Sequence, residues 1–198
     1  MIPVQLQTEP ASFDAKVRQK GLTWMRRSNL DITKPVPKGR KIESYWTACL
    51  PELLEAYDRI CAYVCIYIEE VTGSGTVEHF VPKSKRLDLA YEWSNYRLVC
   101  SVMNSNKNKF EDILDPFEMQ QEMFQLLVNG KIEPISTLTS DRHRKAVETI
   151  ERLKLNSPAC RRARLYYFNK YVAKQITVDY LRERSPFVWL EMQRQGWL

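Results

Sequence analysis

The stretch TVEHFVPKS, residues 76–84, places a carboxylate directly before a histidine near the end of a short apolar-rich segment. Successive side chains of a strand point to opposite faces, so Glu78 and His79 would face opposite sides of one strand. One side chain can then hold a metal ion while the other reaches a substrate. Pro82 has no backbone N–H to donate to a ladder, so residues 82–89 are predicted to form an irregular loop.

The flanking residues favour short strands followed by a helix. Residues 64–68 are β-branched or aromatic apart from Cys65, and the turn signal TGSG at 72–75 separates them from 76–81, which predicts a β-hairpin. Residues 96–100 are a further strand candidate, and the polar residues 101–110 suit a short helix.

Two asparagines follow the histidine. Asn95 lies in WSNYRL, and Asn104 lies in CSVMNSNK, three positions before Lys107. Residues three apart share a face of a helix, so Asn104 and Lys107 are expected side by side. Taken singly, such asparagines are most often turn or cap residues, and Glu78 is most often a solvated strand residue. The ordered set is what points to chemistry.

That set resembles a known family. The motifs E-H-F-x-P-K-S at 78–84, W-x-N-x-x-L-x-C around Asn95 and N-x-x-K at 104–107 resemble an HNH endonuclease of the ββα-metal class, in the variant whose last histidine is asparagine. The stretch DLAYEW at 88–93 further resembles the HNH effector subunits of bacterial anti-phage systems of the Septu and retron-associated types. Those effectors work beside a large P-loop ATPase. The resemblance covers residues 61–110.

The resemblance implies a role for each matching residue. In the catalytic set, His79 would be the general base that activates water, and Asn95 would fix the loop between the strands and orient His79. Glu78 and Asn104 would ligate one divalent ion, Mg²⁺ or Mn²⁺, since both ions prefer oxygen ligands. The ion would stabilise charge on the phosphate and the leaving oxygen. Nucleic-acid phosphates would be held by four cations: Lys83, Lys85, Arg86 and Lys107.

The cysteines depart from the wider family, many of whose members bind structural zinc through two Cys-x-x-Cys pairs. The first pair here is Cys61 and Cys65, with one residue too many between them, and Cys100 is followed by Met103 in the fourth place. A thioether is a poor zinc ligand, so we expect no structural zinc. Cys61, Cys65 and Cys100 are predicted to be buried thiols.

The expected fold class is α+β, with a small ββα core embedded in a mainly α-helical single domain of 198 residues. The core spans about 61–110, between helical regions at 1–60 and 111–198. The local signals predict a helix at 12–27, a loop at 28–41, a helix at 43–62 that Pro51 breaks or restarts, a helix at 140–155, and a helix that Ser157 caps, that runs to about 182 and that is ended by Pro186.

Composition restricts the class of protein. The chain is 44% apolar and 27% charged, as in ordinary globular proteins, and its longest apolar run, 61–68, is far too short to span a membrane. No signal peptide is evident at the amino terminus, and five cysteines without scaffold spacing indicate reduced thiols, so we expect a cytoplasmic protein.

The net charge of +6 is compatible with a polyanionic partner. Two basic stretches, 142–145 and 161–164, could bind phosphates or could be solvated helix faces, and the sequence leaves both open. The function expected is metal-dependent cleavage of nucleic acid, DNA rather than RNA, by an effector whose helical regions bind an ATPase. The alternatives are a non-catalytic binding module on an HNH-like fold and a stand-alone restriction or repair nuclease.

Overall fold

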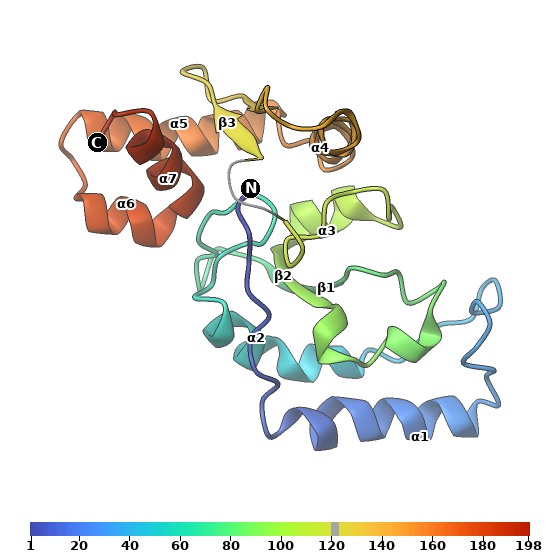
Figure 1. Ribbon diagram of the computed structural model, residues 1–198. Helices are drawn as coiled ribbons and strands as arrows, with labels where there is room; N and C mark the ends of the chain where they lie inside the picture. The colour runs from blue at the N-terminus through green and yellow to red at the C-terminus, as the bar shows by residue number, and fades with distance from the viewer. Residues whose placement is uncertain (120–122) are drawn as a thin grey trace.

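The structure is a computed structural model that describes residues 1–119 and 123–198. It is α+β, and its described strands form two separate antiparallel pairs. In Figure 1 the β1–β2 pair and α3 lie in the middle, with α1 and α2 on one side and α4–α7 on the other. Across the described ranges, no helix combines the length and the apolar character needed to cross a bilayer.

The elements follow one another in mostly short steps along the chain. A π-helical turn precedes α1, and 3₁₀ turns precede α2 and interrupt the long connection between the first two strands. In chain order they are the π turn Asp14–Arg18, α1 Gln19–Arg27, the 3₁₀ turn Tyr45–Cys49, α2 Leu50–Ala56, β1 Gly75–His79, the 3₁₀ turns Leu87–Leu89 and Trp93–Asn95, β2 Tyr96–Cys100, α3 Ser101–Lys107, β3 Phe124–Leu126, β4 Ile132–Pro134, α4 Ser140–Arg152, α5 Pro158–Val172, α6 Val178–Arg184 and α7 Pro186–Arg194.

The predicted hairpin of residues 64–68 with 76–81 is wrong. The partner of β1 is β2, in a register that sets Glu78 opposite Arg97 and His79 opposite Tyr96. The apolar run at 61–68 is instead a buried irregular segment, in which Cys65 has a left-handed φ of 53° and its N–H donates to the Cys61 carbonyl at 2.8 Å. Its apolar character reflects burial rather than an extended strand.

The connection from β1 to β2 is the irregular loop that Pro82 predicts. It closes with a backbone hydrogen bond from Phe80 N to Asn95 O at 3.0 Å. The predicted strand at 96–100 and the short helix after it are confirmed as β2 and α3. Helix α3 follows β2 without a linker and contacts both strands, so Asn104 is carried back to the strand that holds Glu78 and His79.

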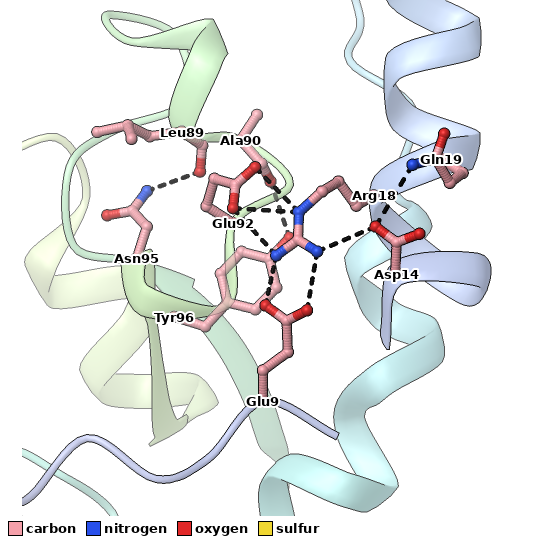
Figure 2. Close-up of polar contacts among 9 residues, drawn as sticks. All are labelled: Glu9, Asp14, Arg18, Gln19, Leu89, Ala90, Glu92, Asn95 and Tyr96. Atoms are coloured by element: carbon pink, nitrogen blue, oxygen red, sulfur yellow. Dashed lines mark hydrogen bonds and ion pairs between the residues drawn. The ribbon is translucent and has the colours of Figure 1, made fainter. Parts of the chain in front are cut away.

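An arginine near the amino terminus fixes this loop from outside (Figure 2). Arg18, in the π turn, forms ion pairs with Glu9, Asp14 and Glu92, and Glu92 belongs to the loop between the strands. In the core behind it, the ring of Phe13 meets the ring of Tyr96 edge-on at 5.8 Å. The amino-terminal helix thus supports the loop that Asn95 and His79 also contact.

The amino-terminal elements follow the local signals. The predicted helix at 12–27 is confirmed. Residues 28–41 form the predicted loop and contain no helix or strand. Pro51 lies in the first turn of α2, where its missing N–H costs nothing, so it restarts the helix as predicted. Helix α2 ends at Ala56, short of the predicted residue 62, because the chain turns at two residues of positive φ, Asp58 and Arg59.

The carboxy-terminal third agrees with the sequence at the starts of its helices and differs at their ends. Ser157 Oγ accepts a hydrogen bond from Cys160 N at 3.3 Å, which confirms the predicted cap. The helix stops at Val172 rather than near 182, and Thr177 caps a separate helix, α6. Helix α6 ends at Arg184, just before Pro186 as predicted, and Pro186 also begins a further helix, α7. The β3–β4 pair was not predicted.

Candidate active site

A cleft of about 800 Å³ lies beside the end of β1. Four of the residues singled out in the sequence line it: Glu78, His79, Lys83 and Asn104. The first two come from β1, Lys83 from the following loop and Asn104 from α3. The pairing of β1 with β2 and the position of α3 therefore bring Glu78 and Asn104, which are 26 positions apart in the chain, to the same cleft.

The hydrogen bonds of His79 assign its tautomer. Its Nε2 lies 2.9 Å from the carbonyl oxygen of Ala90, which also accepts a hydrogen bond from the Tyr96 hydroxyl at 2.9 Å. A carbonyl can only accept, so Nε2 carries the proton and Nδ1 of the neutral ring carries the lone pair. Within the described residues Nδ1 has no partner, and it is not among the buried unpaired atoms, so it is open to solvent.

The surroundings keep His79 neutral. Burial, reinforced by the positive charge of Lys83, lowers the pKa of His79 to about 3. The ring is held between Trp46 and Tyr96, with ring centroids 4.7 Å and 5.0 Å away and both contacts edge-on. His79 is therefore a fixed, unprotonated imidazole at neutral pH, with one lone pair available to accept a proton.

Glu78 lies at the inner end of the cleft and is only 2% exposed. Its Oε1 pairs with Lys107 Nζ at 2.8 Å, and its Oε2 accepts a hydrogen bond from the Tyr63 hydroxyl at 2.9 Å. Burial raises the pKa of Glu78, and the neighbouring charge of Lys107 opposes that rise. Each carboxylate oxygen has used one of its two lone pairs, which leaves acceptor capacity for a further cation.

The side chain of Asn104, which belongs to α3, lies against the face of β1 that carries Glu78. Its Nδ2 donates to Thr76 Oγ1 at 3.1 Å, and Thr76 and Glu78 are two positions apart on the strand. Oδ1 of Asn104 has no hydrogen bond among the described residues and is not a buried unpaired atom, so it is open to the cleft. A carboxylate and an amide oxygen on one face are the hard donors that Mg²⁺ or Mn²⁺ takes, so the residues fit such an ion.

The donor set is small. In the part of the chain that the structure describes, no three His, Cys, Asp or Glu side chains form a group that could hold a metal. An ion held here would thus rest on Glu78, Asn104, water and substrate oxygens, as is common for Mg²⁺ bound at phosphate sites.

Asn95 lies outside the cleft and holds the loop. Its Oδ1 accepts from Val81 N at 2.8 Å, and its Nδ2 donates to the carbonyls of Val81 and Leu89 at 3.0 and 3.1 Å. Figure 2 shows Asn95 beside Leu89, one residue before the Ala90 carbonyl that orients His79. Asn95 therefore fixes the loop whose Ala90 carbonyl contacts His79.

Lys107 does not occupy the place that the sequence predicts. Its side chain is completely buried, and besides Glu78 its Nζ donates to the carbonyls of His79 and Phe80 at 3.0 and 2.5 Å. This placement contradicts the expected phosphate contact, because no nucleic acid can reach the ammonium. Lys107 instead compensates the charge of Glu78 and fixes the end of β1.

The other three predicted cations differ in position. Lys83 lines the cleft, with its Nζ 4.7 Å from the centroid of the Trp46 ring, and burial lowers its pKa. Lys85 pairs with Glu111 at 2.5 Å, and Arg86 pairs with Asp88 at 2.6 Å. Neither Lys85 nor Arg86 lines the cleft, so Lys83 is the one of the four predicted cations that lines the cleft with His79.

Several residues around the site are not singled out by the sequence. Tyr63 and Trp46 read as core aromatics, and their contacts with Glu78 and His79 depend on packing between distant segments. Two cations of the loop at 28–41, Arg40 and Lys41, and one after α3, Lys109, also line the cleft. The available signal is the density of Lys and Arg at 34–41.

Two of the three singled-out cysteines, Cys61 and Cys100, line a second cleft, which contains none of the candidate site residues. Cys61 and Cys65 are buried and Cys100 is half-buried, close to expectation. The sulfurs of Cys61 and Cys100 are 4.0 Å apart, whereas Cys65 Sγ contacts the Ala62 carbonyl at 3.9 Å. The hydrogen bond from Cys61 lowers the pKa of Cys100 to about 6.

The two basic stretches of the carboxy-terminal third lie outside the candidate cleft. Arg164 is buried and donates to the carbonyls of Gly130 and Leu155, which is a structural role. Arg144 pairs with Asp141 within its own helix, as expected of a solvated helix face. These stretches do not contribute to the cleft around His79.

Comparisons with known proteins do not add a family to this geometry. A scan against protein-family models and a search of curated proteins both found no match to this chain.

Proposed function

We propose that this chain is a metal-dependent endonuclease that hydrolyses phosphodiester bonds in DNA. The observation that carries the proposal is the state of His79: a neutral imidazole, anchored through Nε2 and open at Nδ1, lining a cleft rich in cations. A proton acceptor beside positive charge is what attack by water on a phosphodiester requires.

The residues divide the work as follows. Nδ1 of His79 takes a proton from a water molecule as the water oxygen forms a bond to phosphorus and the bond from phosphorus to the leaving oxygen breaks. A bound phosphodiester brings negative charge that opposes the effect of Lys83, so the basicity of His79 rises when substrate binds. The Ala90 carbonyl stabilises the imidazolium that forms, since Nε2–H remains its donor.

A divalent ion fits the same scheme. Glu78 and Asn104 would hold one Mg²⁺ or Mn²⁺, which would supply positive charge for the phosphate oxygens and the leaving group. Lys107 and Tyr63 would orient Glu78 from behind, through the contacts that they already make with its carboxylate. The proposed cofactor is therefore Mg²⁺ or Mn²⁺, and the proposal includes no zinc ion.

The order of elements also supports the HNH interpretation. Motif residues from β1, the loop, β2 and α3 occur in the chain order that the resemblance implies, and three of them line one cleft: Glu78, His79 and Asn104.

The same resemblance implies that the chain is an effector that works beside a P-loop ATPase. The ATPase would activate cleavage by the chain. Co-expression with the neighbouring operon product, followed by affinity purification, tests that partner; recovery of the chain alone contradicts it.

Plasmid nicking tests the activity. Supercoiled plasmid is incubated with the wild-type chain in Mg²⁺ or Mn²⁺, with and without EDTA, and where the chain alone is inactive the ATPase is added. The matched variants are His79→Ala and His143→Ala, because His143 is an exposed histidine on α4 far from this cleft in sequence. Metal-dependent nicking that survives only in His143→Ala supports the proposal. Equal nicking by both variants, or none under any condition, overturns it in favour of a binding module.

A further inference from the structure

The connection between α1 and α2 forms part of the cleft wall. Residues 36–44, here called the strap, contain no helix or strand, and Arg40, Lys41 and Ser44 line the cleft. The strap is fixed near both ends: Val36 N donates to the Ser84 carbonyl at 3.0 Å, and the Tyr91 hydroxyl donates to the Glu43 carbonyl at 2.8 Å. In Figure 1 it lies beside the loop that follows β1.

The charges of the cleft are strongly unbalanced. It is lined by four cations that have no carboxylate partner in the described ranges, namely Arg40, Lys41, Lys83 and Lys109. Glu78 is the one carboxylate among the described lining residues, and Lys107 already compensates it. Uncompensated cations converging on one cleft create a positive potential that favours an anionic ligand.

The paired cations nearby provide the contrast. Lys85 and Arg86 follow His79 by six and seven positions, against four for Lys83, yet both pair with acids outside the cleft. Lys85 and Arg86, outside the cleft, thus each have a carboxylate partner, whereas the four cations that line the cleft have none among the described residues. Four unpaired cations exceed what one scissile phosphate needs, so the surplus points to neighbouring phosphates of the same polymer.

We infer that the strap is a phosphate-binding element that grips the DNA backbone next to the phosphate held at His79, through Arg40 and Lys41. This inference rests on the proposed function and adds its substrate contacts. The guanidinium of Arg40 can make a bidentate contact with one phosphate, and Lys41 contributes a point charge. Because the inferred contacts are with phosphates and not with base edges, the grip would be independent of sequence.

The strap leads directly into the residue that packs against the His79 ring. Two residues after it, Trp46 packs edge-on against His79 and beneath the ammonium of Lys83. A strand held by the strap is therefore positioned relative to the ring that activates water. The same segment joins substrate binding to the placement of the base.

Equilibrium binding tests the strap without requiring cleavage. Fluorescence anisotropy of a fluorescein-labelled 20-base-pair duplex, in EDTA and across a salt series, is measured with the wild-type chain. The test variant is Arg40→Ala/Lys41→Ala. The matched control, Arg26→Ala/Arg27→Ala, removes the same charge from two exposed side chains at the end of α1, outside the cleft.

The strap variant is expected to bind about 10- to 100-fold more weakly near 0.15 M salt, and the slope of log K against log salt should fall in magnitude by about 1.8, for two lost phosphate contacts. The control should stay within about threefold of wild type. Equal affinities for wild type and the strap variant, equal losses in both variants, or no binding by wild type would each overturn the strap. Metal- and His79-dependent nicking, measured separately, shows whether the proposed function survives that result.

Discussion

Replacement of Lys107 by methionine should destabilise the fold far more than an ordinary lysine substitution. The ammonium is fully buried and makes three contacts, with Glu78 at 2.8 Å and with the carbonyls of His79 and Phe80. Methionine fills a similar volume but leaves the Glu78 carboxylate with Tyr63 as its remaining partner. Removing one member of a buried ion pair costs roughly 3–5 kcal/mol, so the free energy of unfolding should fall by that amount.

A double-mutant cycle separates the pair from the packing. Urea unfolding monitored by circular dichroism gives the free energy of unfolding for wild type, Lys107→Met, Glu78→Gln and the double variant. Because the double variant leaves no buried charge unpaired, it should be more stable than the sum of the single losses predicts, by about 1.5 kcal/mol or more. A loss below about 1 kcal/mol for Lys107→Met, or additive losses in the cycle, would refute the buried ion pair.

The remaining predictions concern the base, the loop and a thiol. The pKa of His79 is lowered from 6.5 to about 3, so the folded state resists protonation that the unfolded state accepts. Relative to His79→Gln, the wild type should lose stability as pH falls below 6.5, by up to about 1.4 kcal/mol per pH unit in urea titrations, and parallel pH curves would contradict this. Asn95→Ala removes three hydrogen bonds to the loop; it should cost roughly 2–4 kcal/mol in thermal or urea unfolding and lower nicking more than DNA affinity, whereas an unchanged stability would exclude its role in the loop. Cys100, whose pKa is lowered to about 6, should be the first cysteine alkylated by iodoacetamide at pH 7 in peptide mass mapping, and earlier labelling of Cys49 would contradict its placement.

Local signals explain which parts of the fold could be predicted. Pro82, the mostly apolar run at 96–100 and the polar run after it indicated the loop, β2 and α3, because each depends on nearby residues. The partner of β1 could not be found this way, since the apolar run at 61–68 is buried without being extended. The break before α6 was also hidden, because the chain turns at Lys174 in a left-handed conformation with no glycine or proline to mark it.

The candidate site divides in the same way. Glu78, His79 and Asn104 line one cleft because β1 carries the first two and α3, which packs on β1, carries the third; the motif spacing already indicated this arrangement. The burial of Lys107 could not be anticipated, because helical spacing places it beside Asn104 but does not show what covers that face. Arg40 enters the cleft through a loop that is distant in sequence and is fixed by contacts with residues 84 and 91.

The central claim is that His79 removes a proton from the attacking water rather than merely supporting the fold or binding DNA. The most direct measurement is the single-turnover nicking rate of His79→Ala against that of His143→Ala, in Mn²⁺, at DNA occupancies matched by anisotropy. The account predicts a rate at least about 100-fold lower for His79→Ala, with affinities for DNA within about threefold of each other. Equal rates at matched occupancy, or a loss of rate that disappears once occupancy is matched, would contradict it.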